Sequence, residues 1–332
     1  MEGPDLRKKR SKIAYWQRVF SAYLGKRNSH LTFWHGTPQV NENASLKELG
    51  EYYMTFSYKA EYPGPFDNHG IPLLDYHGKV GLQYNPIAIA QYALAHYNRF
   101  VKTGDQKHLR TFLKQCEWLL RNLEPNSKGI YVWNHYFDWE YREVLKAPWY
   151  SALAQGQGIS TLVRAHALTG RKDYIEGARR AFEAFRHEIE EGGVKYTDNK
   201  GYVWLEEAIV DPPTHILNGF IWALWGVYDY YLATGDEYAL DLFWNCVETL
   251  KDNLYRYDCG FWSLYELSGT RLKMIASPFY HKLHIVQLKV MYKLTEESIF
   301  KEFAERWENY QRNRFYRWLS LMYKIVFKLL YY

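Results

Sequence analysis

The stretch that decides the fold is residues 84–120, YNPIAIAQYALAHYNRFVKTGDQKHLRTFLKQCEWLL. It joins an apolar segment rich in Tyr and Ala, a short Thr-Gly-Asp turn, and an amphipathic segment with many charges. Gly104 can adopt the left-handed conformation that ends many helices, and Asp105 can cap the helix that follows. The stretch therefore predicts a helical hairpin with its turn at residues 103–105.

The same layout recurs three more times, in residues 150–185, 213–250 and 284–310. The turn threonines are Thr103, Thr169, Thr234 and Thr295, with intervals of 66, 65 and 61 residues. In the fourth repeat Glu296 replaces the glycine. Repeats of this kind bury their apolar faces against their neighbours. The sequence thus predicts an all-α chain, an incomplete (α/α) barrel of about four helical hairpins with turns near 169–171, 234–236 and 295–297.

Four long segments rich in Gly, Pro and aromatic residues separate the repeats: residues 61–84, 125–149, 192–214 and 255–280. Most are longer than ordinary helix–helix connections, and loops of this length in a compact domain usually carry function. Each connects the charged helix of one hairpin to the apolar helix of the next. We therefore expect them to gather at one end of the barrel, where we place the active site.

The chain ends differ from the repeats. Residues 1–60 form an N-terminal extension with a basic amphipathic helix over residues 9–24, followed by a loop with a short strand. Residues 61–315 form the barrel, and residues 316–332 form an amphipathic C-terminal tail. The tail is apolar, with three cations spaced along it, and is either a packing helix, a disordered end or a helix on a membrane surface.

Composition excludes several classes of protein. Apolar residues make up 47% of the 332 residues and charged residues 24%, as in ordinary globular proteins. The net charge of +5 is too small and too interleaved with acids for nucleic-acid binding, and suits an acidic ligand weakly. The 13 Trp and 31 Tyr exceed what a core needs, and rings that stack on sugars are one use for the excess.

The cysteines and the N-terminus indicate the compartment. Cys116, Cys246 and Cys259 are odd in number and lack metal-ligand spacing, so neither a disulfide framework nor a metal site is expected. The basic N-terminal run has no apolar segment after it, which argues against a signal peptide. No segment is apolar enough to span a membrane. The expected location is the cytoplasm, with contact to a membrane surface left open.

Several strings resemble the D-glucuronyl C5-epimerases, the family that acts on heparosan and heparan sulfate. They are residues 84–98, residues 149–170, the double Glu and LNGFIWALWGVYDYY between residues 206 and 231, LYEL at 264–267, and YHKLHIVQLKVMYKL at 280–294. The resemblance covers about residues 52–310, and the strings occur in the family's order. It implies an α/α barrel, in agreement with the repeats.

The resemblance also implies a reaction. The family inverts C5 of D-glucuronyl residues within a polysaccharide, giving L-iduronyl residues, without a cofactor. A base removes the C5 proton, and a donor on the opposite face returns one. Carried over residue by residue, the family's catalytic groups fall on Glu207 as a base, Tyr280 on the opposite face and Tyr265 as a donor or relay.

Two positions depart from the family pattern. Ala208 stands where the family has a tyrosine after the double Glu, and Phe279 stands where similar enzymes have an aspartate before the Tyr-His pair. The missing phenol at Ala208 is compatible with an altered rate, an altered substrate or a tyrosine supplied from elsewhere. Without the resemblance, two acids before a helix more often interact with its dipole.

Further residues are expected to bind the substrate because they lie in the loops or at the helix starts that follow them: Tyr84, Arg142, Trp149, Gln157, Asn218 and His281. Helix N-terminal amides beside Gln157 and Asn218 could hold a carboxylate, although packing through small residues explains them equally well. His281 and His284 have i, i+3 spacing, but no companion acids lie nearby, so no metal is predicted.

The expected partner is an acidic, glucuronate-containing polysaccharide similar to heparosan, and a homodimer is left open. Three rival functions remain. A polysaccharide lyase on an α/α toroid begins with the same C5 proton removal, and an unsaturated glucuronyl hydrolase would need an aspartate pair. A non-catalytic glycan-binding protein would explain the change at Ala208.

Overall fold

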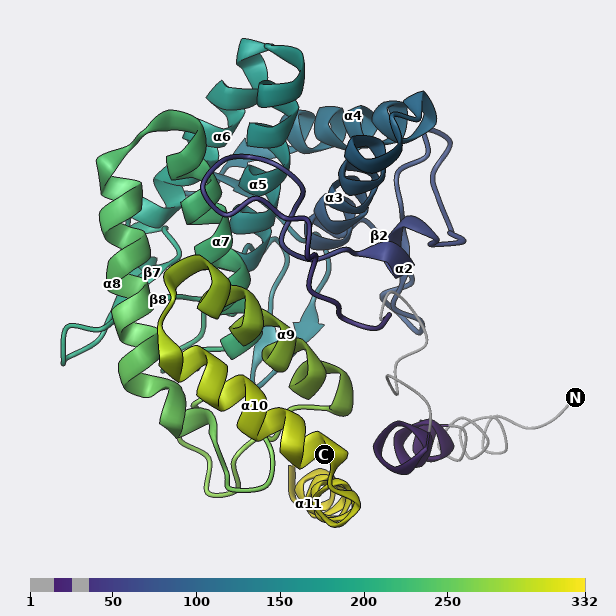
Figure 1. The fold of residues 1–332 in the computed structure, drawn as a ribbon, viewed down its shortest axis with the longest axis vertical. Helices are drawn as coiled ribbons and strands as arrows, with labels where there is room; N and C mark the ends of the chain where they lie inside the picture. The colour runs from purple at the N-terminus through teal and green to yellow at the C-terminus, as the bar shows by residue number, and fades with distance from the viewer. Residues whose placement is uncertain (1–14, 26–35, 332) are drawn as a thin grey trace, which may run out of the picture. The chain divides into compact units, whose positions relative to one another are not determined.

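The computed structural model describes residues 15–25 and 36–331, and these fall into two compact units (Figure 1). The hairpin unit comprises residues 39–255. The terminal unit comprises residues 1–38 and 256–332. Helices dominate the described residues of both, and strands occur only as two-stranded pairs. The predicted division after residues 60 and 315 stays a prediction.

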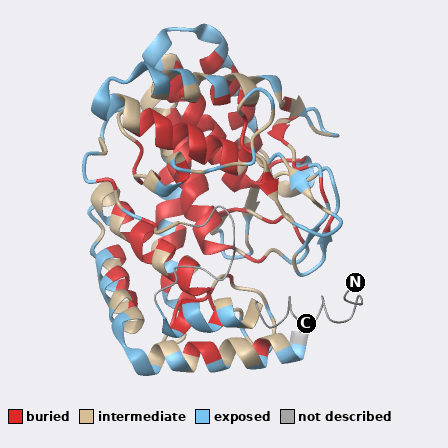
Figure 2. Cartoon of the chain, turned by 90° about the vertical axis from the view of Figure 1, so that its right-hand side faces the viewer, coloured by how far each residue is buried: buried red, intermediate tan, exposed pale blue. Residues whose placement is uncertain are grey.

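Three helical hairpins build the hairpin unit. Their helices are α3 (Pro86–Thr103) with α4 (Gln106–Arg121), α5 (Ala152–Thr169) with α6 (Lys172–Arg186), and α7 (Leu217–Thr234) with α8 (Glu237–Asn253). Helix α5 packs between α3 and α7, and each amphipathic helix covers its apolar partner. The inner helices are mostly buried, as Figure 2 shows, and this explains why they are apolar on nearly every face.

The inner helices α5 and α7 approach closely because small residues line their contact. A Cβ at Gly226 would lie 2.3 Å from the Cα of Gly156, and a Cβ at Gly156 would lie 2.6 Å from the Cα of Ala223. No side chain fits in so short a distance. Gly156 of AQGQG therefore packs α5 against α7, whereas Gly158 leaves room for the ring of Trp133.

Each predicted turn is confirmed at the residue level. Helices α3, α5 and α7 end at Thr103, Thr169 and Thr234, and a left-handed glycine follows each of them. The threonine Oγ1 donates to the carbonyl four residues earlier, at 2.6–2.7 Å, and accepts from the amide two residues later, at 3.2–3.3 Å. Asp105 and Asp236 then cap α4 and α8.

The terminal unit contains the fourth predicted hairpin, α9 (Pro278–Thr295) with α10 (Ser298–Arg312). Thr295 makes the same two hydrogen bonds as the other turn threonines. Glu296 takes the place of the glycine and adopts the left-handed conformation, with φ of 60°. A side chain is rarely found there, so this turn carries strain that the other three lack.

Three of the four long connections, those before α3, α5 and α7, contain hairpins of short strands that were not predicted from the sequence. The strands are β1 (Leu74–Asp75), β2 (Leu82–Gln83), β3 (Leu123–Pro125), β4 (Tyr131–Trp133), β5 (Trp139–Glu140), β6 (Val144–Leu145), β7 (Lys195–Thr197) and β8 (Val203–Leu205), each pairing antiparallel with its neighbour. Short helices α2 (Ser57–Ala60), η1 (Ile189–Glu191) and η2 (Leu254–Tyr257) complete the chain. Buried backbone needs hydrogen-bond partners, and pairing supplies them within each loop.

Within the hairpin unit the loops meet one another, as the repeat predicts. The amide of Ala152 donates to the carbonyl of Glu206 at 2.9 Å. Asn126 Nδ2 donates to the carbonyl of Gly192 at 2.8 Å. These bonds join the loops that precede α5 and α7 at one end of the inner helices.

The two chain ends pack together in the terminal unit. Residues 15–24 are helical, and the tail forms helix α11 (Arg314–Tyr331). Val19, Tyr23 and Leu321 form a buried cluster between them, and Arg317 Nε donates to the carbonyl of Tyr23 at 2.6 Å. One side of the tail therefore packs as a helix against the N-terminal helix. Residues 9–14 of the predicted N-terminal helix lie outside the described residues.

Candidate active site

Glu207 lies two residues after β8, in the loop that leads to α7, and its carboxylate contacts the start of that helix. Asn218 Nδ2 donates to Glu207 Oε2 at 3.3 Å. A Cβ at Gly219 would lie only 2.1 Å from the same oxygen. The carboxylate therefore rests against the first turn of α7, in space that exists because residue 219 has no side chain.

Burial raises the pKa of Glu207 to about 8, and the charge of neighbouring Glu206 adds to the rise, while the hydrogen bond from Asn218 opposes it. The residue as a whole is nevertheless not completely enclosed. A carboxyl group with a pKa near the working pH can both take and return a proton. Such perturbed carboxyl groups mark candidate catalytic positions.

Glu206 has a different partner from Glu207. Its side chain is fully buried and contacts His215, whose Nδ1 lies 2.5 Å from Oε1 and whose backbone amide donates to Oε2 at 3.2 Å. The His215 ring stacks on Trp204 with centroids 4.1 Å apart. His215 has φ of 54°, a strained conformation that these contacts hold in place.

The two departures from the family pattern are apolar and buried. Ala208 is 4% exposed and Phe279 is 5% exposed. Phe279 packs edge-on against Tyr280, with ring centroids 5.2 Å apart. Neither position offers a group that could move a proton.

Tyr265 and Tyr280 come together in the terminal unit. Their rings meet edge to face, with centroids 4.9 Å apart and planes at 61°. Tyr280 lies in the first turn of α9, where its amide donates to the capping Ser277 Oγ at 3.3 Å. The amide of Tyr265 donates to the carbonyl of Met274 at 2.8 Å. Both predicted phenols are thus anchored through their backbones beside the start of α9.

His281 is fully buried and bonded on both ring nitrogens. Nδ1 lies 3.1 Å from the amide of Ser263, which makes it an acceptor, and Nε2 lies 3.0 Å from the carbonyl of Trp307. Burial lowers the pKa of His281 to about 3, so the ring is neutral. Ser263 Oγ also contacts His284 Nδ1 at 3.0 Å. The predicted contact of His281 with substrate stays a prediction.

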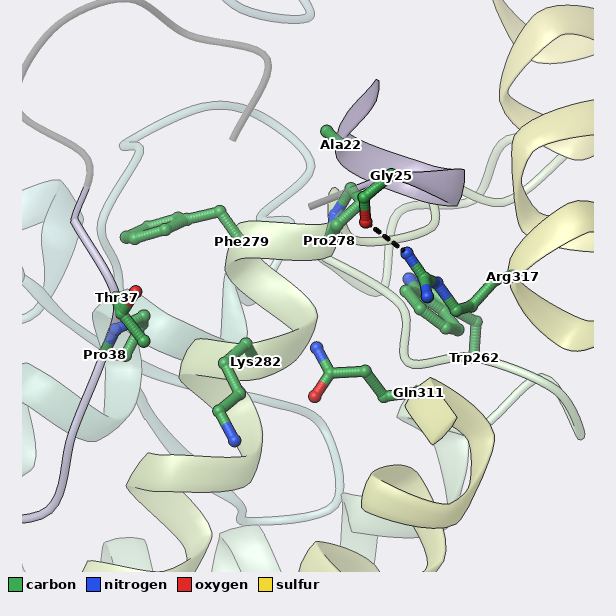
Figure 3. A pocket seen from close by; sticks show the side chains of 10 residues that line it. All are labelled: Ala22, Gly25, Thr37, Pro38, Trp262, Pro278, Phe279, Lys282, Gln311 and Arg317. Atoms are coloured by element: carbon green, nitrogen blue, oxygen red, sulfur yellow. Dashed lines mark hydrogen bonds between the residues drawn. The ribbon is translucent and has the colours of Figure 1, made fainter. Parts of the chain in front are cut away.

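The terminal unit contains a cavity of about 260 Å³ (Figure 3). One of its lining residues, Phe279, directly precedes Tyr280 in the sequence. Its lining includes Phe279 and Lys282 from α9, Gln311 from α10 and Arg317 from α11. Trp262 forms part of its wall and stacks on His281, with ring centroids 3.8 Å apart. The sequence analysis did not predict this cavity, because its walls come from both ends of the chain.

The other predicted binding residues lie in the hairpin unit. Tyr84 is 40% exposed and donates to Asp67 Oδ2 at 2.8 Å. Trp149 stacks on His135 with centroids 3.8 Å apart, and Arg142 is exposed. Gln157 is buried, and its Oε1 accepts from Gln91 Nε2 at 3.0 Å. None of these contacts includes Glu207, so their roles stay predictions.

The structure thus brings the predicted residues together in two pairs. Glu207 with Asn218 belongs to the hairpin unit, and Tyr265 with Tyr280 belongs to the terminal unit. The sequence analysis missed the Glu206–His215 contact. The only sequence feature that could have indicated this contact is a polar histidine between Pro213 and an apolar helix. No three His, Cys, Asp or Glu side chains gather as metal ligands within residues 15–25 and 36–331.

Comparison with known proteins gives one family. The profile described as D-glucuronyl C5-epimerase C-terminus matches residues 126–309. This span includes Glu207, Tyr265 and Tyr280, together with three of the four predicted turns.

Two relatives extend the comparison. An uncharacterised protein of Methanocaldococcus jannaschii is 29% identical over 267 residues, which are 74% of this chain and 85% of that protein. A D-glucuronyl C5-epimerase of Caenorhabditis elegans is 30% identical over 223 residues, which are 62% of this chain and 35% of that enzyme. The chain therefore spans most of the archaeal relative and about a third of the nematode one.

Among solved structures, a cellobiose 2-epimerase from Spirochaeta thermophila superposes with a TM-score of 0.51 and 16% identity, over 91% of this chain and 84% of that one. At this identity the likeness concerns the fold alone. It agrees with the predicted α/α barrel of hairpins.

Proposed function

Because the chain belongs to the D-glucuronyl C5-epimerase family, we propose that it inverts C5 of D-glucuronyl residues, giving L-iduronyl residues, in a heparosan-like polysaccharide. The observation that carries the proposal is the carboxyl group of Glu207. It lies against the start of α7, and burial raises its pKa to about 8.

In the proposed reaction Glu207, as the carboxylate, takes the C5 proton of the sugar. The electron pair of the broken C–H bond moves onto the neighbouring uronate carboxylate, giving an enolate-like intermediate. Tyr280 then gives a proton to the opposite face of C5, with Tyr265 beside it to donate or relay. No net oxidation occurs, and solvent restores both groups.

The pKa of Glu207 suits this role better than that of an exposed glutamate would. The C5 hydrogen is a weak acid, and a stronger base removes it faster. At a pH near 8, about half of the Glu207 carboxyl groups are ionised and retain that higher basicity. The amide of Asn218 holds the carboxylate in place against Gly219 while the proton moves.

The change at Ala208 removes one phenol that similar enzymes carry. The mechanism above needs only two proton-transfer groups on opposite faces, so Glu207 and Tyr280 are sufficient in number. Loss of that phenol is expected to alter rate or substrate preference rather than the type of reaction.

Incubation with heparosan in deuterated water tests the proposal. Proton NMR should show loss of the C5 proton signal, as deuterium replaces the proton, and the appearance of iduronyl signals. Ultraviolet spectroscopy should show no absorbance from an unsaturated uronate. A lyase would produce that absorbance, and a binding protein would do neither. Either result would refute the proposal.

Glu207→Gln should abolish the exchange of the C5 hydrogen in heparosan, a glucuronyl substrate, because the amide keeps the shape and lacks the basicity. Glu248→Gln is the matched control, since Glu248 is an exposed carboxylate on α8 that pairs with Lys251. Equal activity of both variants would remove Glu207 from the mechanism.

A further inference from the structure

Helix α11 exposes a continuous apolar face. Its exposed side chains are Phe315, Trp318, Met322, Val326, Leu329 and Leu330, with exposed fractions from 39% to 78%. The first five are spaced by 3, 4, 4 and 3 residues, which places them on one side of a helix. We call this set the α11 stripe. Figure 2 shows exposed residues along the helix that ends at the C-terminus.

The exposure of the stripe does not come from loose packing of α11. The opposite side of α11 is packed, with Ser320, Leu321 and Phe327 buried. Ser320 Oγ donates to the carbonyl of Tyr316 at 2.8 Å, and Arg317 fixes the helix to the carbonyls of Tyr23 and Gly25. A helix held this firmly still presents large apolar side chains outward, and a patch of that kind usually marks an interaction surface.

The charges around the stripe all have one sign. Helix α11 carries Arg314, Arg317, Lys324 and Lys328 and contains no acidic residue. Arg314 and Lys328 are 14 residues apart, about four turns, so they lie toward the same edge of the stripe. Arg317 and Lys324 lie on the packed side, where Arg317 bonds to the N-terminal helix and burial lowers the pKa of Lys324 to about 8. The cavity beneath the helix is lined by Arg317 and Lys282, and no acid occurs among its described lining residues.

The sequence before the N-terminal helix adds to this charge. Arg7, Lys8, Lys9, Arg10 and Lys12 precede the helix at residues 15–24, which packs directly on α11. Phe20 and Leu24 of that helix are also exposed, at 47% and 46%. The helix at residues 15–24 and α11 therefore both expose large apolar side chains in the same unit.

We propose that the α11 stripe docks on a lipid surface rich in anionic headgroups, with α11 lying in the plane of the interface. A second copy of the chain fits less well, because pairing two stripes would bring the four cations at their edges, Arg314 and Lys328 of each copy, together without an acid on either helix. Cations flanking an apolar face with Trp and Phe are the features of interfacial helices. Within the described residues no helix is long and apolar enough to cross a membrane.

Sedimentation of the full chain with lipid vesicles tests the proposal. The chain should bind vesicles of phosphatidylcholine mixed with phosphatidylglycerol and bind pure phosphatidylcholine much more weakly. High ionic strength should release it from the mixed vesicles, because counter-ions screen exposed charges. Equal binding to both vesicles, or binding insensitive to salt, would refute the role of charge.

Variants test whether vesicle binding depends on the α11 stripe or on any exposed apolar side chain. Trp318→Glu with Met322→Glu should lower vesicle binding by at least about ten-fold, because two apolar groups leave the interface and two charges oppose the headgroups. Trp244→Glu is the matched control, since Trp244 is a similarly exposed tryptophan on α8, at 42% against 49%. Arg314→Gln with Lys328→Gln should lower binding to mixed vesicles by about ten-fold or more, at roughly five-fold per cation.

All of these positions are at the surface, and circular dichroism should show unchanged helix content and thermal midpoint. If no vesicle binds the chain, the proposal is wrong. If light scattering instead shows a dimer that Trp318→Glu dissociates, the stripe is an interface with a second copy.

Discussion

At the scale of single residues, the pKa of Glu207 leads to a testable pH dependence. Burial raises that pKa to about 8, and only the ionised carboxylate can act as the base. The kcat/KM for epimerisation should therefore rise about ten-fold per pH unit below pH 8 and level off above it. A profile that is flat between about pH 6 and 9 would contradict the assignment of Glu207.

The raised pKa of Glu207 also affects the free energy of unfolding, which should fall as the pH rises. The folded chain holds this proton more tightly than an unfolded glutamate does, so the stabilisation is complete below the ordinary pKa and is lost as the pH rises through about 8. Glu207→Gln cannot ionise, so its free energy of unfolding should lack this decline. The comparison of both proteins in urea at several pH values provides a control that is independent of activity.

The two proposed proton-transfer groups should each serve a different face of the sugar C5. Glu207→Gln and Tyr280→Phe should both stop net inversion, because each removes the group serving one face of C5. Their residual hydrogen exchange should differ, one acting on glucuronyl and the other on iduronyl substrate, as measured by mass spectrometry in deuterated water. Near wild-type inversion by Tyr280→Phe would make Tyr280 structural, and Tyr265 would be tested next.

Gly219 should be intolerant of a side chain. Its Cβ would lie 2.1 Å from Glu207 Oε2, so Gly219→Ala must displace the carboxylate or the start of α7. We expect kcat/KM to fall at least ten-fold, because misplacing a reacting group by about 1 Å can cost about a hundred-fold. Gly269→Ala is the control, since its Cβ meets no atom within 4 Å. Equal activity of both variants would show that the position of the Glu207 carboxylate is not critical.

At the scale of helices and turns, the repeated turn predicts opposite effects at matched positions. Glu296 occupies the left-handed position that Gly235 occupies in the third hairpin, with φ of 60° and 68°. Glu296→Gly should raise the free energy of unfolding by up to about 1 kcal/mol, and Gly235→Ala should lower it by about 1 kcal/mol. Chemical denaturation measures both. A loss of stability in Glu296→Gly would contradict the strain inferred at that turn.

The turns were predictable because they depend on local chemistry. The Thr-Gly-Asp pattern specifies a helix end, a left-handed residue and a cap within a few positions, and all four turns occur where it predicts. The strand pairs in the loops were not predictable to the same degree. Strands β5 and β6 have two residues each, too few for an alternating pattern to be recognised.

At the scale of the whole molecule, a buried ion pair supports the hairpin unit. Arg164 on α5 and Asp229 on α7 are 1% and 0% exposed, and Arg164 Nη1 lies 2.6 Å from Asp229 Oδ2. Tyr53 OH donates to Asp229 at 2.8 Å, and Arg164 Nε donates to the carbonyl of Gly50 at 2.9 Å. The pair therefore ties the segment before α3 to the inner helices.

Breaking one side of this pair should cost more than removing both. Arg164→Met leaves a buried carboxylate without its cation, and the free energy of unfolding should fall by about 3–5 kcal/mol. Arg164→Met combined with Asp229→Leu should recover much of that loss, because no uncompensated charge remains. Urea denaturation of the single and double variants measures the difference. A double variant no more stable than the single one would contradict this account.

The sequence by itself determined the hairpins, their turns and the family. Those features are local or repeated, so a single repeat already carries the information, and strings such as those around Glu207 and Tyr280 are contiguous. Only the tertiary structure decided the surroundings of each group. The pKa of Glu207 depends on burial and on Asn218, and its carboxylate fits only because Gly219 has no side chain. The α11 stripe is visible only once the other side of the helix is packed. Burial and close approach arise from residues distant in sequence, so no local pattern encodes them.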